Sequence, residues 1–222
     1  LASLAATIKQ SGAVAGIQLT HSGGKTERSM TGGVLMGPSA VAVPVKDRNL
    51  ELPTSMTLPE IELWKQSFIN AADRAAQAGF DLIELHAAHG YGLNQWLSPI
   101  TNQRDDEYGN SLQGRMRLVL EIVHLVKSKY PQLLISVRMP GQDFLEGGLT
   151  ITDTIEIAQA LEKVGVDILN ISSGIGGWRR PSPRIGEGYL VEEAESIKGI
   201  VNVQIIGVGE MNQVLTSMKV YD

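Results

Sequence analysis

Residues 79–99 read GFDLIELHAAHGYGLNQWLSP and combine a short apolar run with a polar cluster that follows it directly. The run 82–85 predicts a β-strand. His86, His89 and Tyr91 come where this strand ends. Because parallel α/β proteins place their sites beyond the carboxyl ends of strands, the order of strand and cluster favours this fold class.

The same alternation of short apolar runs and longer helical patterns extends in both directions along the chain. The helix 56–79 begins with a capping box, Thr57 with Glu60, and ends at Gly79. Runs this apolar leave no solvated face, so strands separated by helices predict a parallel sheet. The expected strands are 14–19, 82–85, 134–139, 168–171 and 203–208, and the expected helices are 4–10, 56–79, 112–126, 150–165, 192–198 and 211–218.

Two architectures satisfy this pattern, a (β/α)8 barrel and an open doubly wound sheet. An open sheet concentrates its site at one switch point, whereas a barrel draws site residues from many strand ends. We therefore predict a parallel (β/α)8 TIM barrel, a single domain over residues 1–222, with about five of eight strands present and both ends of the barrel missing. The polar residues that carry this prediction lie at the ends of all five strands: Gln18 and His21, His86 and His89, Arg138, Asn170 and Ser172, and Gly209.

Residues 22–55 are rich in Gly, Pro and Ser and show no clear period. A segment of this length without regular structure is unusual in a compact domain, so we expect a long loop or lid, or a partly disordered segment. An incomplete barrel leaves two strand edges open, and self-association into a homo-oligomer is expected through them.

Composition argues against several classes of partner and location. The net charge is -5, and no basic stripe is present, so nucleic acid and acidic membrane surfaces are poor partners. No apolar run reaches the roughly 18 residues of a membrane span, and no signal peptide is recognisable. The chain has 0 Cys, which removes disulfides and thiolate metal sites and fits a cytoplasmic protein.

The cluster of His86, His89 and Tyr91 suits catalysis on a carbonyl compound. Imidazole N–H groups can donate to an oxygen and stabilise negative charge that develops there, and a phenol can deliver a proton. The structural alternatives are strand-end histidines satisfied by their neighbours and a packing tyrosine. A His-x-x-His pair also suits zinc, but no third ligand follows with suitable spacing, so no metal is expected.

Residues 79–99 resemble the signature of the old yellow enzyme family of NADH:flavin oxidoreductases, and residues 102–111, Arg115 and Arg117 continue the pattern. The resemblance extends through nearly all of the chain. It implies FMN as the cofactor and NADH or NADPH as the reductant. It also implies that the two histidines bind the oxygen of a small-molecule substrate and that the tyrosine of the cluster donates a proton to it. Many members carry Asn at the second histidine position, and either residue can donate.

Three further positions acquire a cofactor role through the same resemblance. It places Gln18 at the pyrimidine side of the flavin, Arg138 beside the N1/C2=O edge and Gly209 near the phosphate. The alternatives are a glutamine bonded to backbone, a salt bridge inside the barrel and a simple turn. At Gly24-Lys25 the chain departs from the family, where an arginine is common, and the contact of that arginine is in question.

The loop after the expected strand 168–171 resembles a family loop near the site. Trp178 is the candidate substrate-binding residue there, with Arg179 and Arg180 beside it. The alternative is a flexible surface loop.

The resemblance therefore implies an ene-reductase that passes hydride from NAD(P)H through FMN to activated C=C bonds, such as those of α,β-unsaturated carbonyls. Another FMN-dependent barrel enzyme, of the dihydroorotate dehydrogenase kind, is the enzymatic alternative, and the His-x-x-His-Gly-Tyr cluster argues against it. The non-enzymatic alternative is a barrel fragment without cofactor or activity.

Overall fold

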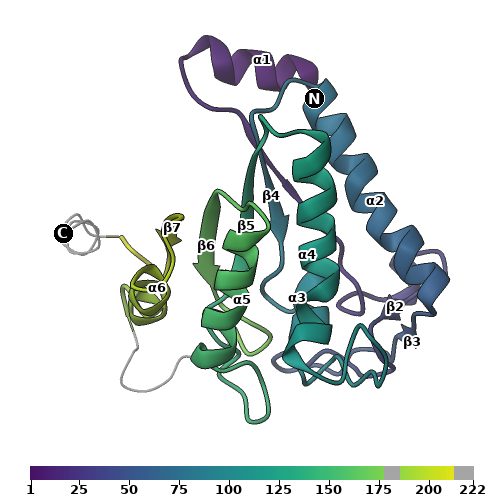
Figure 1. Ribbon diagram of the computed structural model, residues 1–222. Coiled ribbons are helices and arrows are strands. Elements are labelled where there is room, and N and C mark those ends of the chain that lie inside the picture. The colour runs from purple at the N-terminus through teal and green to yellow at the C-terminus, as the bar shows by residue number, and fades with distance from the viewer. Residues whose placement is uncertain (178–185, 213–222) are drawn as a thin grey trace.

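Five parallel strands form the central sheet of the computed structural model, which describes residues 1–177 and 186–212 (Figure 1). Their order in space is their order along the chain, with no switch point, as in the wall of a barrel. All five expected strands are confirmed. They are β1 (Gly16–Leu19), β4 (Leu82–His86), β5 (Leu134–Pro140), β6 (Ile168–Ser172) and β7 (Gln204–Gly207).

The helices follow the expected pattern with one addition. The capping boxes that begin α2 and α5 are both formed, by Thr57 with Glu60 and by Thr150 with Asp153. The short helix α3 is not expected from the sequence, because six residues show no helical period. The expected helix 211–218 lies largely outside the described residues. The helices are α1 (Ala2–Gln10), α2 (Leu58–Gln77), α3 (Gly92–Leu97), α4 (Leu112–Lys129), α5 (Ile151–Lys163) and α6 (Val191–Lys198).

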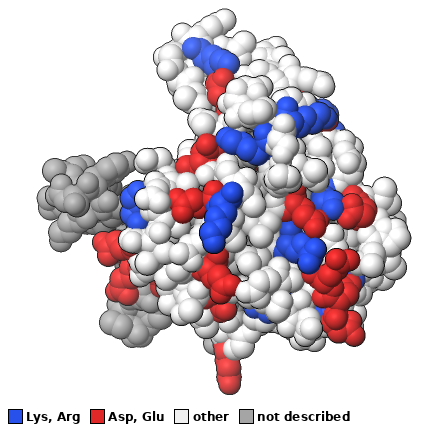
Figure 2. Space-filling view, viewed as in Figure 1, with Lys and Arg blue, Asp and Glu red and all other residues white. Residues whose placement is uncertain are grey.

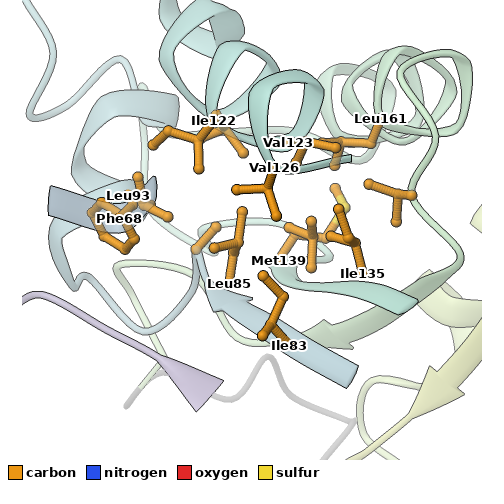
Figure 3. Packing of buried hydrophobic residues seen from close by; sticks show 14 of the residues in the cluster. Phe68, Ile83, Leu85, Leu93, Ile122, Val123, Val126, Ile135, Met139 and Leu161 are labelled. Carbon is orange, nitrogen blue, oxygen red and sulfur yellow. The ribbon is translucent and has the colours of Figure 1, made fainter. Parts of the chain in front are cut away.

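The core lies between the sheet and the helices that cover one of its faces (Figures 1 and 3). Every one of its central aliphatic side chains is at most 1% exposed. Each contributes roughly 1.5–3 kcal/mol to stability on burial. In Figure 3, α4 presents Ile122, Val123 and Val126 to Ile83, Leu85, Ile135 and Met139 of the sheet.

The face of the sheet away from the helices carries polar side chains. Successive side chains of a strand point to opposite faces, so polar residues at alternate positions gather on this second face. The expectation that these runs are too apolar to leave one face polar is therefore wrong, because polar side chains alternate with apolar ones along the strands. The register places Gln18, Glu84 and Ser136 in one row across the sheet and His86, Arg138 and Asn170 in the next.

The segment 22–55 contains a 3-10 turn, η1 (Arg28–Met30), and two short strands that pair in parallel, β2 (Met36–Gly37) and β3 (Thr54–Ser55). Val43 and Leu50 of this segment pack with Ile175, which lies in the loop after β6. The segment thus reaches the carboxyl end of the sheet, and its role as a lid stays a prediction.

The face of the molecule seen in Figure 2 carries both signs of charge, with Lys and Arg interspersed among Asp and Glu over the helices. Within residues 1–177 and 186–212, no helix combines the length and the apolar character that crossing a bilayer requires.

Candidate active site

A cavity of about 560 Å³ opens at the carboxyl ends of the strands. This volume lies in the range of small-molecule sites. His89, Arg138 and Gly209 line it, although they come from three different strand ends. Lys25, Lys46 and Arg48 of the segment 22–55 add positive charge to the lining, so the cavity favours anionic groups.

The loop that follows β4 is held in an unusual backbone conformation. His89 has a φ of 60°, in the left-handed region that non-glycine residues rarely adopt. Its N–H donates to the carbonyl of Ser173 at 2.9 Å, and the N–H of Ala87 donates to the carbonyl of Arg138 at 2.8 Å. The ends of β5 and β6 therefore hold the loop in place, and the His89 ring turns back toward His86.

The two imidazoles are the middle of a chain of four hydrogen-bonding side chains. Thr20 Oγ1 lies 3.1 Å from Nδ1 of His86. Nε2 of His86 lies 3.0 Å from Nδ1 of His89. Nε2 of His89 lies 2.7 Å from Oγ of Ser172. The chain links residues from the ends of β1, β4 and β6, so the structure brings both predicted histidines to one place.

Both histidines have lowered pKa values. Burial lowers the pKa of His86, and the guanidinium of Arg138 lowers it further. Burial and the same guanidinium lower the pKa of His89 to about 4. Both rings are therefore neutral at pH 7, and each has one N–H donor and one acceptor nitrogen.

The lowered pKa of His89 predicts a loss of stability in acid. Between about pH 4 and the ordinary histidine value of 6.5, the folded state binds fewer protons than the unfolded state. The free energy of unfolding is therefore complete above this window and falls as the pH drops through it. We expect His89→Asn to remove up to about 1.4 kcal/mol per pH unit from this dependence in urea denaturation. His124→Asn, a change on the exposed side of α4, is the control, and an unchanged slope in His89→Asn would contradict the assignment.

Tyr91 is the N-cap residue of α3 and lies against the histidine pair. Its ring centroid is 5.1 Å from that of His86. Lys25 Nζ sits 4.5 Å from the centroid of the tyrosine ring and donates to the carbonyl of His89 at 2.5 Å. Sequence reasoning noticed Lys25 only as a departure from the family, whereas the structure places its ammonium group beside the predicted proton donor.

Glu84 organises the polar face below the histidines, and sequence reasoning gave it no role. Its carboxylate accepts from Gln18 Nε2 at 2.7 Å, from Ser136 Oγ at 2.9 Å and from Asn170 Nδ2 at 3.0 Å. The amide nitrogen of Gln18 is thereby engaged, and its oxygen is the atom left for another partner. The signal for Glu84 in the sequence was a carboxylate at an alternate position of an otherwise apolar strand.

Arg138 lies at the centre of this polar face. Its Nη2 donates to Ser172 Oγ at 3.3 Å. Among the described residues, Nε of Arg138 and Oδ1 of Asn170 are buried without a hydrogen-bond partner. Such atoms each cost about 1–3 kcal/mol, so this site suits a bound molecule that carries both hydrogen-bond acceptors and an N–H group.

Gly209 lies just beyond β7, on the far side of the cavity from the histidines. Its φ is 131°, and an added Cβ would lie 3.0 Å from the backbone nitrogen of Tyr189 and 3.1 Å from that of Leu190. Only glycine fits here without strain, and its missing side chain leaves room in the lining of the cavity. Trp178, the candidate substrate-binding residue, and the neighbouring Arg179 and Arg180 lie outside the described residues.

Comparison with known proteins gives a consistent picture. A family model described as the NADH:flavin oxidoreductase / NADH oxidase family matches residues 1–219. The NADPH dehydrogenase of Geobacillus sp. (strain WCH70) is 40% identical over 209 residues, which are 94% of this chain and 59% of that protein. The NADH oxidase of Thermoanaerobacter brockii is 39% identical over 219 residues, which are 95% of this chain and 33% of that protein.

Solved structures share the fold. A 2-naphthoyl-CoA reductase in complex with 2-naphthoyl-CoA matches with a TM-score of 0.86 at 28% identity, over 98% of this chain and 35% of that one. An old yellow enzyme homologue from Zymomonas mobilis matches with a TM-score of 0.80 at 21% identity, over 99% of this chain and 62% of that one, a likeness of fold alone. These neighbours are TIM barrels, which confirms the predicted fold class. The chain thus spans less than two thirds of the length of each of these four proteins.

Proposed function

Because the chain belongs to the NADH:flavin oxidoreductase / NADH oxidase family, we propose that it carries FMN and passes hydride from NADH or NADPH to the activated C=C bonds of small molecules. The resemblance to the old yellow enzyme family is confirmed, and the relatives named above indicate FMN with NAD(P)H as the reductant. The observation that carries the finer proposal is the neutral pair His86 and His89, set beside Tyr91 and Arg138.

The residues present fit a flavin. The pyrimidine edge of a flavin carries carbonyl acceptors and an N–H donor. Arg138 offers a buried, unpartnered Nε to the acceptors, and Gln18 has its amide oxygen available for the N–H. Gly209 lines the cavity, and its missing side chain would let a phosphate approach the backbone closely. We assign these three residues to cofactor binding.

The substrate is proposed to be an α,β-unsaturated carbonyl compound or a similar acceptor. FMN, when bound, supplies hydride transfer between the nicotinamide and the acceptor. His86 and His89 donate hydrogen bonds to the acceptor oxygen and stabilise the negative charge that develops on it. Tyr91 gives its proton to the substrate carbon, and Lys25 on the ring face stabilises the charge left on the phenol.

Arg138→Gln is expected to weaken FMN binding about tenfold, a loss of roughly 1.4 kcal/mol. The variant removes a charged donor and keeps much of the side-chain volume. Fluorescence titration of FMN into both proteins measures the two dissociation constants. Arg117→Gln is the matched control, because Arg117 is 45% exposed and pairs with Glu107 on the surface. Equal FMN affinity in the Arg138 variant and the wild type would contradict the assignment, and failure of the wild type to bind FMN at all would contradict the proposed cofactor.

A further inference from the structure

The histidine pair cannot, as it stands, offer two N–H groups to one oxygen. Its inner nitrogens, Nε2 of His86 and Nδ1 of His89, are 3.0 Å apart and bond to each other. A hydrogen bond between them needs a proton on one and none on the other. Since each neutral ring carries one proton, both rings in the free protein must have it on the same type of nitrogen, either both on Nε2 or both on Nδ1.

An oxygen that accepts from both rings requires a different arrangement. Both inner nitrogens must then carry a proton, so His86 is the Nε2–H tautomer and His89 the Nδ1–H tautomer. One proton moves from one nitrogen to the other within a single ring, and no proton is gained or lost. The outer nitrogens, Nδ1 of His86 and Nε2 of His89, are left as bare acceptors.

Each outer nitrogen faces a hydroxyl side chain, which can bond to that nitrogen whether or not it carries a proton. Nδ1 of His86 faces the hydroxyl of Thr20, and Nε2 of His89 faces the hydroxyl of Ser172. A hydroxyl can accept from an N–H or, after rotation, donate to a bare nitrogen. A carboxylate or carbonyl could only accept, and would hold a proton on the outer nitrogen. Arg138 donates to Ser172 Oγ, which occupies one lone pair and leaves the hydroxyl proton available for His89.

We propose that Ser172 and Thr20 are positioning residues. In the free protein, one of the two hydroxyls accepts a hydrogen bond from its histidine; when substrate binds, both hydroxyls donate to the bare outer nitrogens. His86 and His89 can then present two N–H groups to one substrate oxygen. The inference rests on the proposed oxygen-binding role of the pair. Ser172 is 2% exposed, whereas Thr20 is exposed, so water can take the place of the Thr20 hydroxyl more readily than that of Ser172. Ser172 therefore carries the larger effect.

Nitrogen NMR of histidine-labelled protein reads the tautomers directly, because the chain has only four histidines. In the free protein we expect the same neutral tautomer at His86 and His89. In the FMN-loaded protein with para-hydroxybenzaldehyde bound, we expect Nε2–H at His86 and Nδ1–H at His89. Opposite tautomers or a cationic ring in the free protein at pH 7, or no change on binding, would overturn the proposal.

Variants supply the second arm of the test. Ser172→Ala is expected to weaken para-hydroxybenzaldehyde binding about tenfold and Thr20→Val about threefold, as for the loss of one hydrogen bond, while Thr20→Ser restores wild-type affinity. In a His89→Asn background the second donor has no tautomer, so Ser172→Ala should then cost little. Equal costs of Ser172→Ala in the two backgrounds would overturn the proposal. FMN titration and circular dichroism check that each variant folds.

Different results would contradict the oxygen-binding role of the histidine pair and the switch of the two hydroxyls. If para-hydroxybenzaldehyde does not bind to the FMN-loaded wild type, the oxygen-binding role is wrong. The spectra of the free protein still test the hydrogen bonds from Thr20 to Ser172 through the two rings, since Thr20→Val must change the His86 ring signals and Thr20→Ser must not. If the compound binds and neither ring changes its tautomer, the oxygen-binding role of the pair is retained and the hydroxyl switch is wrong.

Discussion

The double variant His86→Ala/His89→Ala is expected to lose the long-wavelength charge-transfer band that para-hydroxybenzaldehyde gives with oxidised FMN, and to lose roughly 10³-fold in kcat/KM for an enone. The two imidazoles lie together at the end of β4, and we propose that both donate to the substrate oxygen when it is bound. Without them, the substrate oxygen loses the two N–H donors that are proposed to stabilise the negative charge developing on it. Absorbance titration reads the band, and steady-state oxidation of NADPH reads the turnover.

The controls for this variant separate binding of the ligand from binding of the cofactor. His124→Ala on the exposed side of α4 should leave both the band and the turnover unchanged. FMN affinity should stay within about threefold of the wild type, because the cofactor contacts are assigned to Gln18, Arg138 and Gly209. Persistence of the charge-transfer band in the double variant would show that other groups bind the ligand oxygen.

Tyr91→Phe is expected to slow reoxidation of the reduced protein by an enone by about 10² or more, the usual scale of general acid catalysis. The change keeps the ring that lies against His86 and under Lys25 and deletes only the hydroxyl. Reduction by NADPH needs no proton from this residue and should barely change. Stopped-flow absorbance measures the two half-reactions separately.

Tyr130→Phe is the matched control for this variant. Tyr130 is the C-cap residue of α4, at the end of the sheet away from the cavity, so the loss of its hydroxyl should affect neither half-reaction. A loss of the same size in both half-reactions of Tyr91→Phe would indicate that Tyr91 is structural and that the substrate is protonated by another group.

The parts of this protein that its sequence determined are those with local signals. Thr57 with Glu60 predicted the start of a helix, because a capping box is formed by residues three apart. Short apolar runs predicted all five strands. The pair His86 and His89 could be recognised because it is contiguous with its strand and with the signature around it.

Only the tertiary structure decided which of these residues hydrogen-bond to one another. Thr20 and His86 are 66 residues apart in the chain, and Ser172 and His89 are 83 apart, so no local pattern connects them. The same holds for Glu84, which collects donors from three other strands. The physical reason is the parallel register, which aligns alternate side chains of neighbouring strands on one face of the sheet. Hydrogen bonds across that face depend on which strands are neighbours. No short stretch of sequence contains this information.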